Sequence, residues 1–318
     1  MKNITQGQKE QYKEITKDLL KTTTAKNQNL HKAKQVKNDE FYTQIEDIEK
    51  ELQHYKQHLK GKVVYCNCDD PEWSNFFGFF SLNFKKLGLK KLITTHYTKD
   101  STSYKLEMIN EEIEPVKTNL KEDGDFRSKE CLELLKEADI VITNPPFSLF
   151  REFIDKLTEY NKKFLIIGGK NALTNKNTFK LFQENKIRTG VNEVRNFLTP
   201  NNEIKRVITC WFTNLEYEFK KQIKSMKTFK GNEENYPKYD NYDAIEVSEL
   251  KKFPIDYCGI MGVPITYLEK HDPEKYELIS TVSPYLDGKQ KYKRVFIRKI
   301  KTFNSNINNY KFNDLLVA

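Results

Sequence analysis

The stretch Asn144-Pro145-Pro146-Phe147 carries the residue types best suited to chemistry. It follows Ile140–Thr143, a short β-branched run typical of a buried strand. The two prolines lack backbone donors and fix φ, so the strand ends there, and Asn144 is pushed to an extended conformation. The turn presents an amide, carbonyl groups with no neighbouring N–H to pair them, and an aromatic ring. These groups would fit a planar molecule carrying an NH2 group. The alternative is a rigid loop with Phe147 in the core.

Alternating strands and helices would have to position this turn. The pattern predicts strands at 62–66, 89–95, 139–143 and 164–168, and helices at 73–87, 128–138 and 148–160. An amphipathic helix within 39–59 precedes them, and a late strand at 208–214 suggests a hairpin that closes the sheet. We therefore predict an α/β fold with a mostly parallel central sheet and a late antiparallel hairpin. Ligands of such sheets bind outside the carboxyl ends of the strands.

Composition narrows the class of protein. The chain has 318 residues and a formal net charge of +9, which favours a polyanionic partner. Its five cysteines are odd in number and form no Cys-x-x-Cys pair, which argues against a disulfide framework or a structural zinc site. We therefore expect no metal and a cytoplasmic location. We also expect no membrane segment, because no apolar run approaches the length of a membrane span.

The distribution of charge suggests three regions. Residues 1–38 form a basic arm with nine lysines against three acidic residues, residues 39–214 contain the alternating strands and helices, and residues 215–318 are an added region expected to carry substrate contacts. Each basic cluster could equally be a solvated face. The candidate phosphate contacts are Lys32, Lys34, Lys37, Lys220, Lys221, Lys293 and Arg294.

Asn-Pro-Pro-Phe after a strand resembles the fourth motif of the amino-methyltransferases that use S-adenosylmethionine. The whole chain resembles one group of them, the EcoRI-type adenine-specific DNA methyltransferases, and the blocks that carry the resemblance span roughly residues 30–270. These blocks are 30–34, 39–44, 63–71, 124–128, 144–150, 162–167, 236–244 and 261–266.

The resemblance implies a Rossmann-like methyltransferase fold and direct attack of an adenine N6 on the methyl group of the cofactor. It implies that residues 39–214 are the catalytic domain and residues 215–318 the DNA-recognition region. Asn144, Pro145, Pro146 and Phe147 would be the catalytic residues. The Asn144 side-chain oxygen and the Pro145 carbonyl would accept the two N6 protons, and Phe147 would stack on a base flipped out of duplex DNA.

The resemblance also places the cofactor site. Its expected residues are Phe41, Tyr42, Cys66, Asn67, Asp69, Asp70, Asp125 and Phe126. The turn at 66–70 departs from the wider superfamily because it contains no glycine. Asp69 or Asp70 could bind the cofactor's ammonium group or could instead cap the helix that begins near Pro71. No ribose ligand is assigned, because the second strand ends at Thr95-His96-Tyr97 rather than at an acidic residue.

The leading hypothesis is a monomeric, site-specific DNA adenine-N6 methyltransferase acting on double-stranded DNA, as the modification partner in a restriction-modification system or as a solitary enzyme. One alternative is a protein glutamine N5-methyltransferase, which would use a similar Asn-Pro-Pro motif. Another is a DNA-binding protein whose catalytic site has decayed. Two features favour DNA as the substrate: the basic regions and Phe147, the phenylalanine that ends Asn-Pro-Pro-Phe.

Overall fold

The computed structural model describes residues 42–71, 74–99, 102–109, 114–199, 203–218 and 222–300. The chain divides into two compact units, Met1–Lys221 and Gln222–Ala318. Tyr217 belongs to the first unit, since its hydroxyl donates to the Thr189 carbonyl over 2.6 Å and its ring packs edge-on against Tyr55. The first unit therefore extends past the predicted boundary at residue 214. The predicted arm at 1–38 lies outside the described residues.

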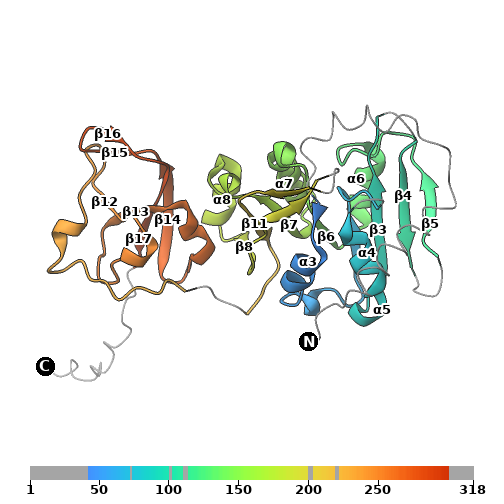
Figure 1. Cartoon of the computed structure of the whole chain (residues 1–318), viewed down its shortest axis with the longest axis horizontal. Helices are drawn as coiled ribbons and strands as arrows, with labels where there is room; N and C mark the ends of the chain where they lie inside the picture. Colours follow the sequence, from blue (N-terminus) through green and yellow to red (C-terminus); the bar gives the residue numbers. More distant parts are fainter. Residues whose placement is uncertain are drawn as a thin grey trace, which may run out of the picture. The chain divides into compact units, whose positions relative to one another are not determined.

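The described part of the first unit contains an eight-stranded sheet in the order β5-β4-β3-β2-β6-β7-β11-β8 (Figure 1). Four neighbouring strands are parallel: β3 (Lys91–His96), β2 (Val63–Cys66), β6 (Ile140–Thr143) and β7 (Lys163–Gly169). Antiparallel strands extend both edges: β4 (Tyr104–Met108) and β5 (Val116–Asn119) on one side, β11 (Thr209–Thr213) and β8 (Arg188–Thr189) on the other. The predicted parallel strands at the centre of the sheet and the late antiparallel strand are confirmed, although the antiparallel strands on both edges make the sheet mixed rather than mostly parallel.

Helices cover both faces of this sheet. Side chains of α3 (Ile45–Leu52), α4 (Asn75–Leu82) and α5 (Phe84–Leu87) share one buried core with Val64 and Trp211. On the other face lie α6 (Lys129–Glu137), α7 (Phe150–Glu159) and α8 (Lys176–Gln183), where the rings of Phe150 and Phe182 meet Phe212. The helix predicted within 39–59 is shorter than expected, because α3 ends at Leu52 and a 3-10 turn, η1 (Lys56–His58), follows.

The strand order creates a crevice beside β2. From β2 the chain goes to β3 on one side, and it later returns to β6 on the other. The connections leaving β2 and β6 therefore diverge, and a gap opens at the carboxyl ends of these two strands. This is the position at which open α/β sheets bind their ligands.

A small second sheet brings the start of the described chain to this edge. Strand β9 (Asn196–Leu198) pairs antiparallel with both β1 (Tyr42–Thr43) and β10 (Ile204–Arg206). The buried Glu51 on α3 reinforces the link, because its carboxylate accepts the backbone N–H groups of Val191 and Asn192, each over 2.7 Å.

The second unit is built on a separate four-stranded sheet in the order β12-β13-β17-β14. The strands are β12 (Ile245–Glu246), β13 (Ile260–Pro264), β17 (Arg294–Lys299) and β14 (Tyr276–Val282), with a hairpin of β15 (Tyr285–Leu286) and β16 (Lys289–Gln290). Short 3-10 turns, η4 (Glu233–Asn235), η5 (Leu250–Lys252) and η6 (Ile265–Lys270), connect them. None of the helices described in either unit has the length and apolar character of a membrane span.

Candidate active site

A cavity of about 260 Å³ lies at the carboxyl ends of β2, β3 and β6. Its wall joins the turn after β2 to the turn after β6. The predicted site residues that line it are Tyr42, Asn67, Asp69, Asp70, Asp125, Phe126, Asn144, Pro145 and Pro146. The structure therefore brings together stretches that are up to about a hundred residues apart in the sequence.

The glycine-free turn after β2 is held by hydroxyl groups of the neighbouring strand. Thr94 on β3 donates to the carbonyl groups of Cys66 and Asp69, and Thr95 donates to the Asn67 carbonyl over 3.2 Å. Among the described residues, the non-glycine positions with positive φ are Asn161, Asn185 and Asp287, and none of them belongs to this turn. Its backbone therefore needs no glycine.

Asp69 sits at the centre of this turn and is buried. Its carboxylate accepts a hydrogen bond from Ser74 Oγ and another from Thr143 Oγ1, both over 2.6 Å. Burial raises the pKa of Asp69 from its ordinary 3.8 to about 7, although these hydrogen bonds act in the opposite direction. The helix-capping alternative is wrong, because the N-cap of α4 is Ser74, whose Oγ accepts from the Phe76 N–H.

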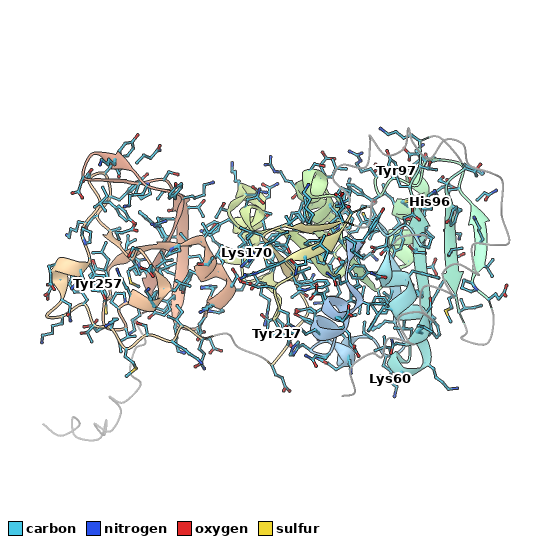
Figure 2. All side chains as sticks on the ribbon, in the orientation of Figure 1. Lys60, His96, Tyr97, Lys170, Tyr217 and Tyr257 are labelled. Atoms are coloured by element: carbon cyan, nitrogen blue, oxygen red, sulfur yellow. The ribbon has the colours of Figure 1, made fainter. Side chains whose placement is uncertain are left out.

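Asp70 lines the cavity beside the end of β3. Its Oδ2 lies 3.0 Å from Nδ1 of His96, and the His96 ring stacks on Tyr104 with centroids 4.8 Å apart. Figure 2 shows His96 and Tyr97 at this end of the sheet. The strand thus places a histidine beside an acidic residue of the neighbouring turn.

Asp125 reaches the cavity from the loop before α6. Both of its carboxylate oxygens accept bonds from the Arg127 guanidinium, each over 2.8 Å. Partial burial would raise the pKa of Asp125, but the bonds from Arg127 outweigh it, and the pKa lies below its ordinary value. Asp125 is therefore a carboxylate paired with Arg127 in the cavity wall. The neighbouring Phe126 is buried and packs edge-on against Phe153 of α7, with centroids 5.1 Å apart.

Two predicted cofactor residues have a different placement. The Cys66 side chain does not line the cavity, because it belongs to the buried core on the α3–α4 face of the sheet. Phe41 lies outside the described residues, but Tyr42 and Thr43 of β1 both line the cavity. Thr43 is held by its carbonyl, which accepts a 2.7 Å bond from the Asn75 side chain.

The turn after β6 presents Asn144, Pro145 and Pro146 to the same cavity. Phe147 begins the 3-10 turn η2 (Phe147–Leu149) and lies outside the cavity wall. Its half-buried ring packs edge-on against Phe197 of β9, with centroids 6.0 Å apart. The small sheet therefore supports the residue that the sequence predicts to stack on a base.

A family comparison decides what kind of site this is. The model of the family described as adenine-specific methyltransferase EcoRI matches residues 29–315. The chain belongs to this family. It is accordingly an adenine-specific methyltransferase, and the resemblance noted in the sequence is confirmed.

Curated relatives agree with the family assignment. The Type II methyltransferase M.EcoRI of Escherichia coli is 45% identical over 316 residues, covering 86% of this chain and 97% of that protein. M.MgeORF184P of Mycoplasma genitalium is 38% identical over 312 residues, covering 85% and 98%. M.MpnI of Mycoplasma pneumoniae is 38% identical over 277 residues, covering 80% and 86%.

The candidate DNA contacts of this methyltransferase are placed only in part. Lys293 is exposed, whereas Lys32, Lys34, Lys37, Lys220 and Lys221 lie outside the described residues. Arg294 has a different partner, since its guanidinium donates to Glu246 over 2.6 Å and both side chains are largely buried. We therefore assign Arg294 to the internal packing of the second unit and keep Lys293 as the candidate for phosphate contact.

Sequence reasoning missed several residues of this site. Thr143 and Ser74 hold Asp69, and Lys99 lines the cavity beyond the end of β3. A signal was available for Thr143, because a hydroxyl at the last position of a strand can bond to a neighbouring turn. Within the described residues, no three or more His, Cys, Asp and Glu side chains are grouped as a metal site would require.

Proposed function

We propose that this chain transfers the methyl group of S-adenosylmethionine to N6 of an adenine flipped out of duplex DNA. The observation that carries the proposal is a single cavity whose wall includes both the Asn67–Asp70 turn and the Asn144–Pro146 turn. The first turn would hold the methyl donor and the second would hold the acceptor. The family assignment supports the reaction type, and the net charge of +9 supports a polyanionic substrate.

The polar groups of the cavity fit the proposed cofactor. Oδ1 of Asn67 and Oγ1 of Thr43 are buried, and among the described residues neither has a hydrogen-bond partner. Buried polar atoms are rarely left unsatisfied, so both are expected to bond to a ligand. Asn67 Oδ1 would accept from the ammonium group, the Thr43 hydroxyl would donate to the carboxylate, and Asp70 and Asp125 would accept from further donors.

S-adenosylmethionine would supply an electrophilic methyl group on a sulfonium centre. Asn144 and Pro145 would act on the acceptor: the side-chain oxygen and the carbonyl accept the two N6 protons, which keeps electron density on the nitrogen and aims its lone pair at the methyl group. Such alignment of reacting atoms is a large part of catalysis.

The face of the Phe147 ring would stack on the flipped base. Its edge-on contact with Phe197 fixes the ring without covering it completely. Base–aromatic stacking contributes about 1–3 kcal/mol, which is comparable to the few kcal/mol needed to take a base out of the duplex.

The wider setting also belongs to the proposal. The relatives are named Type II methyltransferases, which supports a role in a restriction-modification system. We expect a monomer, since one cavity serves one flipped base, and light scattering on the purified protein would measure this.

The test is methyl transfer by the purified chain from labelled S-adenosylmethionine to duplex DNA, followed by sequencing with detection of modified bases. We expect N6-methyladenine at one short sequence. Asn144→Ala should abolish transfer while DNA affinity stays within a few-fold. Asn177→Ala is the matched control, because this exposed asparagine on α8 bonds to Asp155, away from the cavity.

The competing functions give different results in the same assay. Labelling of a protein acceptor but not of DNA would identify a glutamine methyltransferase. DNA binding without any transfer by the wild-type chain would identify a decayed enzyme. Methylation of cytosine instead of adenine would overturn the assignment of the acceptor.

A further inference from the structure

The Asp69 carboxylate joins the two halves of the cavity. One oxygen accepts from Ser74 at the start of α4, and the other accepts from Thr143, the last residue of β6. The backbone N–H of Asn144 bonds to the same carboxylate. Asp69 therefore binds the first residue of the catalytic motif and the residue directly before it.

Thr143 returns the contact from β6 to the cofactor turn. Its Oγ1 donates to Asp69 and accepts from the Cys68 backbone N–H over 3.2 Å. The turn is also tied to the opposite strand, because the Asp69 carbonyl accepts from Thr94 of β3. A shift of this turn would therefore move the end of β6, because two hydrogen bonds of Thr143 join them.

We propose that Asp69 is a positioning residue, which acts through Thr143 and the Asn144 backbone to set the place of the Asn144 amide relative to the cofactor turn. The inference rests on the proposed methyl transfer at Asn144. It gives Asp69 a role besides the expected binding of the cofactor's ammonium group, since its carboxylate already accepts bonds from Ser74 and Thr143.

Thr143→Val tests this role directly, since it removes the hydroxyl and keeps the shape of the side chain. We expect kcat to fall by about 10- to 100-fold, because small displacements of reacting groups cost about that much. The dissociation constants for DNA and for sinefungin, a cofactor analogue, should change less than threefold. Thr143→Ser keeps the hydroxyl and should restore most of kcat.

Thr213→Val is the matched control for loss of a buried threonine hydroxyl from this sheet. Thr213 on β11 donates to the Phe164 carbonyl over 2.7 Å and accepts from the Leu215 N–H over 3.0 Å. Like Thr143 it donates one hydrogen bond and accepts one from a backbone N–H, but it donates to a carbonyl and lies away from the cavity. We expect a lower melting temperature and an unchanged kcat in this variant.

A double-mutant cycle separates action through Asp69 from action through the rest of the turn. If Thr143 works through Asp69, the double variant Asp69→Asn with Thr143→Val loses no more kcat than the worse single variant. Should Thr143→Val fail to fold, Asp69→Asn alone carries the test, with an expected loss in kcat of about tenfold.

The outcomes distinguish a failure of this inference from a failure of the proposed function. A wild-type chain that methylates no DNA would overturn both. An active wild type with normal kcat in Thr143→Val and Asp69→Asn would overturn the inference alone. Additive losses in the double variant, or an equal loss of kcat in Thr213→Val, would likewise overturn it.

Discussion

Replacing Asp69 by asparagine should change how the stability of the first unit depends on pH. Burial raises the pKa of Asp69 from 3.8 to about 7. Between about pH 4 and pH 7, Asp69 is therefore protonated in the folded chain and ionised in the unfolded chain. Stability falls as the pH rises through this window, because the unfolded state binds fewer protons than the folded state there.

The magnitude follows from the size of the shift. Roughly three pKa units at about 1.4 kcal/mol each give about 4 kcal/mol, lost progressively between pH 4 and pH 7. Asparagine has nearly the same shape and does not titrate, so this contribution should disappear in Asp69→Asn. The free energy of unfolding of the variant should equal that of the wild type near pH 4 and should exceed it by up to about 4 kcal/mol at pH 8.

Urea unfolding without cofactor, followed by tryptophan fluorescence at several pH values, would measure the difference. Both tryptophans, Trp73 and Trp211, belong to the first unit, so the signal reports on the cavity-bearing part of the chain. Titrations shared by the two proteins cancel in the comparison. Parallel curves for the wild type and the variant across this window would refute the reasoning.

The remaining predictions concern other parts of the structure. Phe147→Ala should lower kcat by about 5- to 150-fold through the loss of stacking, measured by steady-state methylation, with Phe147→Tyr as a control that retains a ring. Glu51→Ala should destabilise the first unit by about 2–5 kcal/mol in urea, because two backbone N–H groups lose their acceptor. Arg294→Ala should destabilise the second unit by about 3–5 kcal/mol by leaving the buried Glu246 unpaired, whereas Lys293→Ala should only weaken DNA binding and lower its salt dependence.

Local sequence patterns predicted the main sheet well. The strands expected at 62–66, 139–143, 164–168 and 208–214 appear as β2, β6, β7 and β11, each within one or two residues. Such strands are short apolar runs between helices, and burial on both faces makes the pattern strong. The parallel arrangement of β2 and β6 then placed the two turns at one edge of the sheet.

The contacts that complete the site could not be read from local patterns. The pairing of Tyr42 with Leu198 joins residues more than 150 positions apart, and each of the two strands is too short to show a period. The partners of Asp69 come from α4 and β6, and Arg294 meets Glu246 from another strand. The cluster around Lys293 and Arg294 is uniformly basic in sequence. Its members can be told apart only once the sheet is known, because the sheet decides which side chain is buried and which is exposed.

The glycine-free turn also explains why one half of the site was harder to predict than the other. A glycine-rich turn fixes its shape through its own residues and is therefore visible in the sequence. Here the shape is set from outside, by the hydroxyls of Thr94 and Thr95 on β3 and of Thr143 on β6. One of these hydrogen bonds, that of Thr143, also connects the turn to the residue before Asn144. A turn built this way can hold a ligand and position the neighbouring motif with one set of contacts.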